Sequence, residues 1–103
     1  MEVKIFQEEG AMSAQLIGRL DTPAAMEVTR EVQPLIDNAD RTIVLDCSQM
    51  DYISSSGLRI FLTIRKAASA QGGKVVLRGM KEDIRKVFMM TGFLNLFEVE
   101  KAQ

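Results

Sequence analysis

Residues 41–46 read Arg-Thr-Ile-Val-Leu-Asp, an apolar run in which polar and apolar side chains do not alternate. Such a run is typical of a strand in the middle of a parallel sheet whose two faces are both covered by helices. From Gly57 to Gln71, apolar residues recur with helical spacing, and Gly72-Gly73 then provide a left-handed stop. A further apolar strand follows at residues 74–78. A strand, a helix and a strand in this order indicate a parallel unit with a right-handed crossover.

Towards the N-terminus, residues 3–7 and 13–20 have the pattern of two strands joined by a tight turn at Gly10. The sequence Asp21-Thr22-Pro23 then predicts a helix start, because Asp21 can cap free backbone N–H groups and proline suits the first helical position. Pro34 should kink or shorten that helix, because it has no N–H to donate.

Towards the C-terminus, a third helical pattern follows Gly79 and stops at Gly92, and residues 94–99 lead into a last short strand. The predicted order of elements is ββαβαβαβ. We therefore expect a single α/β domain over residues 1–103, with a mixed, mostly parallel sheet of about four to five strands.

The composition excludes several classes of protein. Of the 103 residues, 47% are hydrophobic and 26% are charged, which is ordinary for a globular domain. The net charge of -1 gives no case for binding nucleic acid or an anionic membrane. The chain has neither a run of about 18 apolar residues nor a signal-peptide pattern. The single Cys47 cannot form an internal disulfide, so we expect a cytoplasmic protein.

Histidine is absent. Its absence removes the commonest general base, the commonest metal ligand and the usual partner of a nucleophilic serine or cysteine. No glycine-rich phosphate loop is present either, since Gly72-Gly73-Lys74 lies at a helix exit rather than a helix start. We therefore expect no enzymatic activity, no metal and no cofactor.

Three consecutive serines, Ser54 to Ser56, stand where the chain passes from a central strand into a helix. The simplest interpretation is that one of them caps the helix. A helix start also accepts an anion, including a phosphate attached to its own serine. For the other polar residues nearby, the simplest roles are strand end for Asp46, turn for Asp51 and small buried hydrophobic residue for Cys47.

These landmarks together resemble a known family. Leu20-Asp21, Leu45-Asp46, the run Tyr-Ile-Ser-Ser-Ser-Gly-Leu at residues 52–58 and the tail at residues 87–97 look like a STAS domain of the anti-sigma factor antagonist type. The resemblance implies that the unmodified chain binds an anti-sigma factor, which is also a serine kinase with a histidine-kinase-like ATPase fold, and so releases a sigma factor. Phosphorylation by that kinase would end the binding, and a PP2C-type phosphatase would restore it.

The family motif, Asp-Ser-Ser/Thr-Gly-Leu, implies Ser55 as the phosphate acceptor, with Ser56 as second choice. Ser54 stands where the family has aspartate, so a carboxylate that could orient the acceptor or contact the kinase is missing. The implied partner-binding residues are Asp21, Thr22, Asp46, Ser54, Ser55, Ser56, Gly57 and Leu58.

Two other functions remain open. The domain could be a STAS subunit of another assembly, such as a lipid-transport complex or a stress-signalling particle. More distantly, it could be a small nucleotide-binding protein or enzyme that uses the same helix start. The sequence shows no large apolar stripe on its surface elements, so we expect a monomer.

Overall fold

The computed structural model describes residues 1–100, and the last three residues of the predicted domain, 101–103, lie outside the described part. Within it, five strands form one mixed sheet in the order β1-β2-β3-β4-β5. β1 is antiparallel to β2, and the other neighbours are parallel. The predicted fold class and element order are therefore confirmed. The strands are β1 (Glu2–Glu8), β2 (Ala11–Leu20), β3 (Thr42–Ile53), β4 (Lys74–Arg78) and β5 (Glu98–Glu100). The helices are α1 (Thr22–Glu31), α2 (Gln33–Asp37), α3 (Ser55–Gln71), α4 (Glu82–Met90) and the 3-10 turn η1 (Leu94–Leu96).

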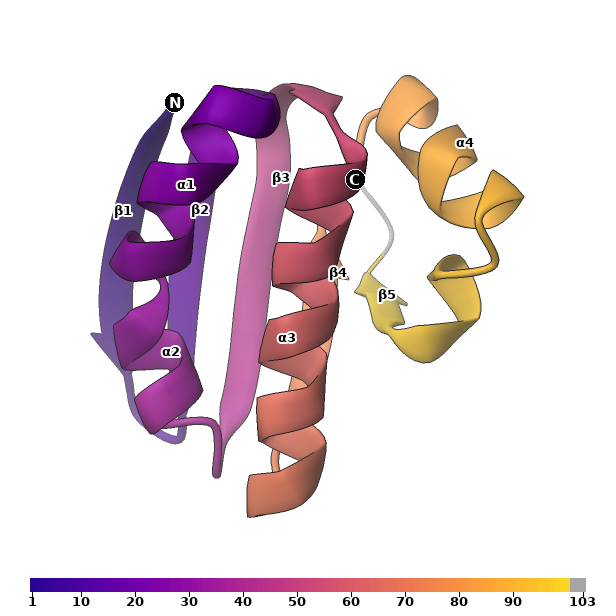
Figure 1. Cartoon of the computed structure of the whole chain (residues 1–103). Coiled ribbons are helices and arrows are strands. Elements are labelled where there is room, and N and C mark those ends of the chain that lie inside the picture. The colour runs from indigo at the N-terminus through magenta and orange to yellow at the C-terminus, as the bar shows by residue number, and fades with distance from the viewer. Residues whose placement is uncertain (101–103) are drawn as a thin grey trace.

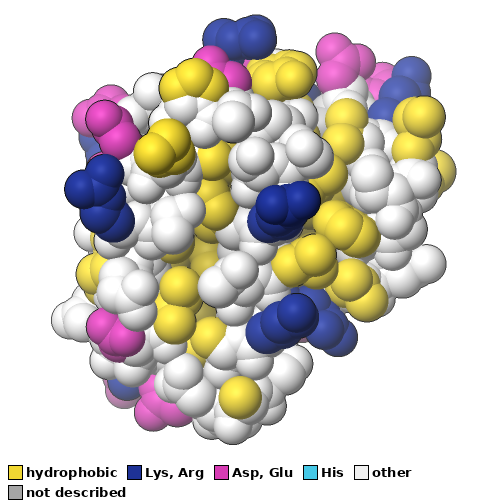
Figure 2. Space-filling view, in the orientation of Figure 1, with side chains coloured by type: hydrophobic (Ala, Val, Ile, Leu, Met, Phe, Trp, Pro, Cys, Tyr) yellow, Lys and Arg dark blue, Asp and Glu magenta, His cyan; other side chains and the backbone are white. Residues whose placement is uncertain are grey.

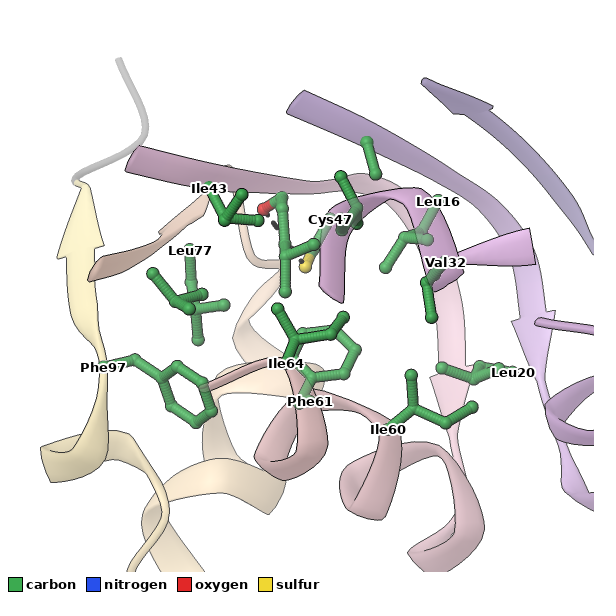
Figure 3. Packing of buried hydrophobic residues seen from close by; sticks show 14 of the residues in the cluster. Leu16, Leu20, Val32, Ile43, Cys47, Ile60, Phe61, Ile64, Leu77 and Phe97 are labelled. Carbon is green, nitrogen blue, oxygen red and sulfur yellow. Dashed lines mark hydrogen bonds between the residues drawn. The ribbon is translucent and has the colours of Figure 1, made fainter. Parts of the chain in front are cut away.

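Within residues 1–100 the helices cover one face of the sheet (Figures 1 and 3). The expectation that helices cover both faces of the central strand is wrong. Val44 lies on the bare face in a row with Ser13 and Val76, its partners on the neighbouring strands. All three are less than 9% exposed, because each is flanked by its neighbours in the row. The apolar run therefore reflects a central position in the sheet, which is confirmed, rather than a second helical layer.

β3 is longer than the sequence predicts, because it continues beyond Asp46 to Ile53. Its pairing with β2 changes register twice, between Gln15 and Ile17 and between Gly18 and Arg19. Each change adds a residue to β3, as β-bulges do, and so interrupts the alternation of buried and exposed side chains. Asp46 and Asp51 therefore lie within a strand, and their predicted roles as strand end and turn are wrong.

The helix boundaries follow local chemistry. Asp21 Oδ1 accepts a hydrogen bond of 3.0 Å from the Ala24 N–H and caps α1, as predicted. The predicted effect of Pro34 is confirmed, because α1 ends before it and a separate short helix, α2, holds it in its first turn. α3 ends at Gly72, whose φ of 86° is the expected left-handed stop. No helix within residues 1–100 combines the length and the apolar character needed to cross a bilayer.

The core lies between the sheet and the helices (Figure 3). Three of its phenylalanines gather where α3, α4 and the chain entering β5 meet. Phe61 of α3 contacts Phe88 of α4 and Phe97 edge to face, with ring centroids 5.3 and 6.3 Å apart. Phe88 and Phe97 complete the triangle at 6.0 Å. These contacts join α3 to α4 and to the chain entering β5.

Replacing Phe61 by alanine should lower the free energy of unfolding by about 3–5 kcal/mol, because it empties a buried site that the backbone cannot fill. The measurement is urea denaturation followed by circular dichroism. Phe6→Ala is the matched control, since Phe6 lies on the edge strand β1 and is 49% exposed. Equal losses in the two variants would contradict the aromatic triangle as part of the core.

Cys47 is fully buried in β3, and its Sγ lies 3.6 Å from the Leu45 carbonyl oxygen, as expected for a small buried residue. Burial raises the pKa of the Cys47 thiol to about 12, and the neighbouring Asp46 carboxylate adds to the rise. The thiolate is the reactive form of cysteine, so the folded protein holds this side chain in its inert state.

Iodoacetamide should therefore leave Cys47 unmodified in the folded protein at pH 9 and alkylate it rapidly in urea. A thiol with an unshifted pKa would be about half ionised at that pH, so the difference between the two states reports the burial of the thiol together with its raised pKa. Mass spectrometry at timed intervals measures it. Similar rates of alkylation in the folded and unfolded protein would show that the thiol is accessible.

Candidate functional site

The site is built where β2 and β3 end side by side. Leu20 pairs with Ile53 in the sheet, and the Ser54 N–H donates a 2.9 Å hydrogen bond to the Leu20 carbonyl oxygen. The chain leaves β2 into α1 and leaves β3 into α3, so the two helix starts are neighbours (Figure 1). Both starts lie at the carboxyl ends of parallel strands, where α/β folds commonly bind ligands.

Ser54 is the N-cap of α3. Its Oγ accepts a 3.2 Å hydrogen bond from the Gly57 N–H, and the residue is only 9% exposed. The expectation that one serine caps the helix is therefore confirmed for Ser54. The side chain holds the helix start in place and presents little surface to a partner.

Ser55 and Ser56 form the first turn of α3. Ser55 is exposed, whereas Ser56 is half-buried and faces α1. Within residues 1–100, neither hydroxyl takes part in a side-chain hydrogen bond, so neither is committed to the fold. The backbone N–H groups of a first helical turn and the helix dipole favour negative charge at these two positions.

Gly57 allows α3 to begin close against the sheet. A Cβ at this position would lie 2.7 Å from Leu20 Cγ and 2.9 Å from Ile53 Cγ1, closer than non-bonded carbon atoms approach one another in proteins. Leu58 follows in the core and is 6% exposed. Both residues are buried and fix the position of the serines, and their part in partner binding stays a prediction.

Asp21 and Thr22 lie at the neighbouring helix start. Asp21 is half-buried and engaged in capping α1, while Thr22 is exposed and borders the same groove as Ser56. The structure therefore brings the predicted residues Asp21 and Thr22 together with the three serines.

Asp46 does not belong to this group. Its Oδ1 accepts hydrogen bonds from the Ser48 N–H at 3.0 Å and the Ser48 hydroxyl at 2.7 Å. It pairs with Arg78 of β4 and lies on the bare face of the sheet. Ser54 is eight positions further along an extended chain, which is on the order of 20 Å or more at the usual rise of a strand. Asp46 therefore lies apart from the serines along β3, and its part in partner binding stays a prediction.

A groove of about 280 Å³ runs between the α1–α2 pair and α3, beginning at the two helix starts. Figure 2 shows hydrophobic side chains along its bottom, between the two helical ridges. Met26, which is 70% exposed, borders it on α1, and Arg59 borders it on α3. Among the described residues that line the groove, Arg59 is the only charged one.

Neither Met26 nor Arg59 was predicted from the sequence. The available signal was the spacing of the lining residues, which recur at intervals of three and four on both helices: Thr22, Ala25, Met26 and Thr29 on α1, and Ser56, Arg59, Ile60 and Thr63 on α3. Such a spacing places residues on one face of a helix, but it does not show which helix faces which.

Near the end of β3, two exposed contacts border the site. Lys81 Nζ lies 2.6 Å from Asp51 Oδ1 and ties the start of α4 to β3. The Arg19 guanidinium lies 4.5 Å from the centre of the Tyr52 ring. Within residues 1–100, no three acidic or cysteine side chains gather as a metal site would require.

Comparison with known proteins identifies the domain. The family model for the STAS domain matches residues 2–102. BtrV of Bordetella bronchiseptica, which is assigned to the anti-sigma factor antagonists, is 33% identical over 103 residues, covering 100% of this chain and 89% of BtrV. The anti-sigma-B factor antagonist of Bacillus subtilis is 26% identical over 100 residues, covering 96% of this chain and 90% of that protein.

A solved structure has the same fold. The Bacillus cell fate determinant SpoIIAA in its phosphorylated form superposes with a TM-score of 0.73 at 20% identity, covering 97% of this chain and 92% of SpoIIAA. The fold, the family match over nearly the whole chain and the serine-glycine helix start agree with one another. This chain belongs to the STAS domain family.

Proposed function

We propose that this chain is an anti-sigma factor antagonist that phosphorylation switches at the start of α3. In the unmodified state it binds an anti-sigma factor that is also a serine kinase, and a sigma factor is released. The phosphorylated state no longer binds, and a PP2C-type phosphatase returns it to the unmodified state. The exchange takes place in the cytoplasm, and the chain serves as ligand and substrate rather than as an enzyme.

The single observation that carries the proposal is the exposed, uncommitted hydroxyl of Ser55 at a capped helix start. The names of two relatives, both anti-sigma factor antagonists, support the regulatory role. The phosphorylated SpoIIAA structure supports a fold that accepts a phosphate.

Among the three serines, Ser55 is the best acceptor. Ser54 is buried and uses its oxygen to cap α3, and Ser56 is half-buried against α1. In the transfer, the Ser55 oxygen forms a bond to the γ-phosphorus of ATP as the bond to the bridging oxygen of ADP breaks. The hydroxyl proton passes to a base of the kinase, so the chain itself needs no catalytic group.

The phosphate should change binding without unfolding the domain. It adds about -1.5 to -2 charges, and at an exposed helix start the dipole favours negative charge by roughly 0.3–1 kcal/mol. At an interface, the same charge must lose water or face like charge, which costs on the order of several kcal/mol. About 1.4 kcal/mol is a factor of ten in affinity, so the phosphate can dissociate the complex.

Incubation with the cognate kinase and ATP should place one phosphate on Ser55. Mass spectrometry of proteolytic fragments locates it, and Ser55→Ala is the negative control. A phosphate on Ser56 would move the acceptor by one residue, and no incorporation at any of the three serines would overturn the proposed switch.

Ser55→Ala should bind the kinase in the presence of ATP and remain bound, because it cannot be phosphorylated. Ser55→Asp should bind several-fold more weakly, since it carries part of the charge of a phosphate. Isothermal titration calorimetry compares the two variants with the unmodified chain. Equal affinities of the two variants would contradict the electrostatic mechanism.

Ser54→Ala should lower the free energy of unfolding by about 1 kcal/mol, because it removes the N-cap of α3. Phosphorylation of Ser55 should persist in this variant, at a lower rate if the first turn frays. Ser69→Ala, an exposed serine within the same helix, is the control. The measurements are urea denaturation and kinase labelling, and an unchanged stability would assign the cap elsewhere.

A further inference from the structure

The groove beside the serines has one cation and an apolar floor. Arg59 is exposed, and within residues 1–100 its guanidinium takes part in no ion pair or side-chain hydrogen bond. By contrast, Arg19 stacks on Tyr52, and Arg65 Nε donates to the Leu96 carbonyl oxygen. Arg59 is thus a positive charge that the fold leaves available at the rim of the groove.

Helix geometry places Arg59 next to the proposed phosphate. Ser55 and Arg59 are four residues apart in α3, and Ser56 and Arg59 are three apart, so all three lie on neighbouring positions of one helix surface. Cβ atoms at such spacings are about 5–6 Å apart, which a long arginine side chain spans easily. An anion placed N-terminal to a cation at this spacing is also the favoured orientation.

We propose that Arg59 is the residue through which phosphorylation is read: it binds a carboxylate of the kinase partner in the unmodified state and pairs with the phosphate once Ser55 is modified. This proposal rests on the proposed function and deepens it. The occupant of the groove is a segment of the kinase that places apolar side chains over Met26 and Ile60 and a carboxylate against Arg59.

Two observations favour that occupant. The groove is lined by apolar and hydroxyl side chains apart from Arg59, so an acidic, partly apolar segment complements it, whereas a basic one would meet an unpaired guanidinium. Ser56 also lines the groove, so a kinase that reaches the neighbouring Ser55 must cover this end of the groove. A planar guanidinium binds carboxylates and phosphates with paired hydrogen bonds, so one residue can serve both states.

Phosphorylation then acts in two ways. The phosphate brings negative charge to the interface and also takes the single positive charge of the groove out of reach of the partner. Both effects lower affinity for an acidic segment. The chain needs no movement larger than one side chain, because the helix that carries both residues stays in place.

The first test uses a chain synthesised with phosphoserine at position 55, which requires no kinase. Phosphorus NMR follows the second ionisation of the phosphate as the pH is raised. A nearby guanidinium favours the dianion, so this ionisation should occur about half a pH unit higher in Arg59→Gln than in the unsubstituted chain. Arg59→Lys should show a smaller displacement, and Arg85→Gln, an exposed α4 arginine that does not line the groove, should show none.

The second test measures the affinity of the unmodified chain for the purified kinase that phosphorylates Ser55. Arg59→Gln should weaken binding about five-fold, the range of an exposed ion pair, and Arg85→Gln should leave it unchanged. An unchanged phosphate titration in Arg59→Gln would overturn the pairing, and an unchanged affinity would overturn the contact with the partner. If no kinase phosphorylates Ser55, the proposed function fails, while the titration still decides the pairing.

Discussion

The arrangement of the whole site depends on how closely α3 approaches the sheet at Gly57. With no side chain there, the first turn of the helix rests directly on Leu20 and Ile53, the last residues of β2 and β3. The same contact brings Ser54 to the helix cap and leaves Ser55 pointing into solvent. The position of the acceptor is therefore set by the packing of the core and not by a loop. A site held so firmly suits a switch that works through charge rather than through refolding.

Much of the fold is predictable from local patterns, because those patterns agree with the tertiary structure. The cap at Asp21, the helix break at Pro34 and the stop at Gly72 follow from the chemistry of single residues. The length of β3 is not predictable in this way. Its bulges shift the alternation of side chains twice, so residues 47–53 look like a polar loop. Helices on both faces of β3 were expected from its apolar run. A central strand with helices on only one face can be equally apolar, so the run does not distinguish the two arrangements.

The candidate site is predictable where its residues adjoin a helix start, and less so elsewhere. The serines and Thr22 lie together because two strands end side by side, which the order of elements already implies. Asp46 is close to the serines in the motif, but the extended chain of β3 between them carries it far along the sheet. Met26 and Arg59 have the spacing of ordinary amphipathic helices, and only the pairing of α1 with α3 shows that they share a groove.

The bare face of the sheet has a consequence for how this domain can change over time. Many side chains of the sheet, among them Lys4, Gln15 and Arg78, contribute nothing to the layer between sheet and helices. Substitutions at exposed positions of this kind usually alter stability by no more than about 0.5 kcal/mol. Mutations can therefore accumulate at the exposed positions of that face without loss of the fold, while the helix-covered face, which also positions the serines, is held to a narrow choice of side chains.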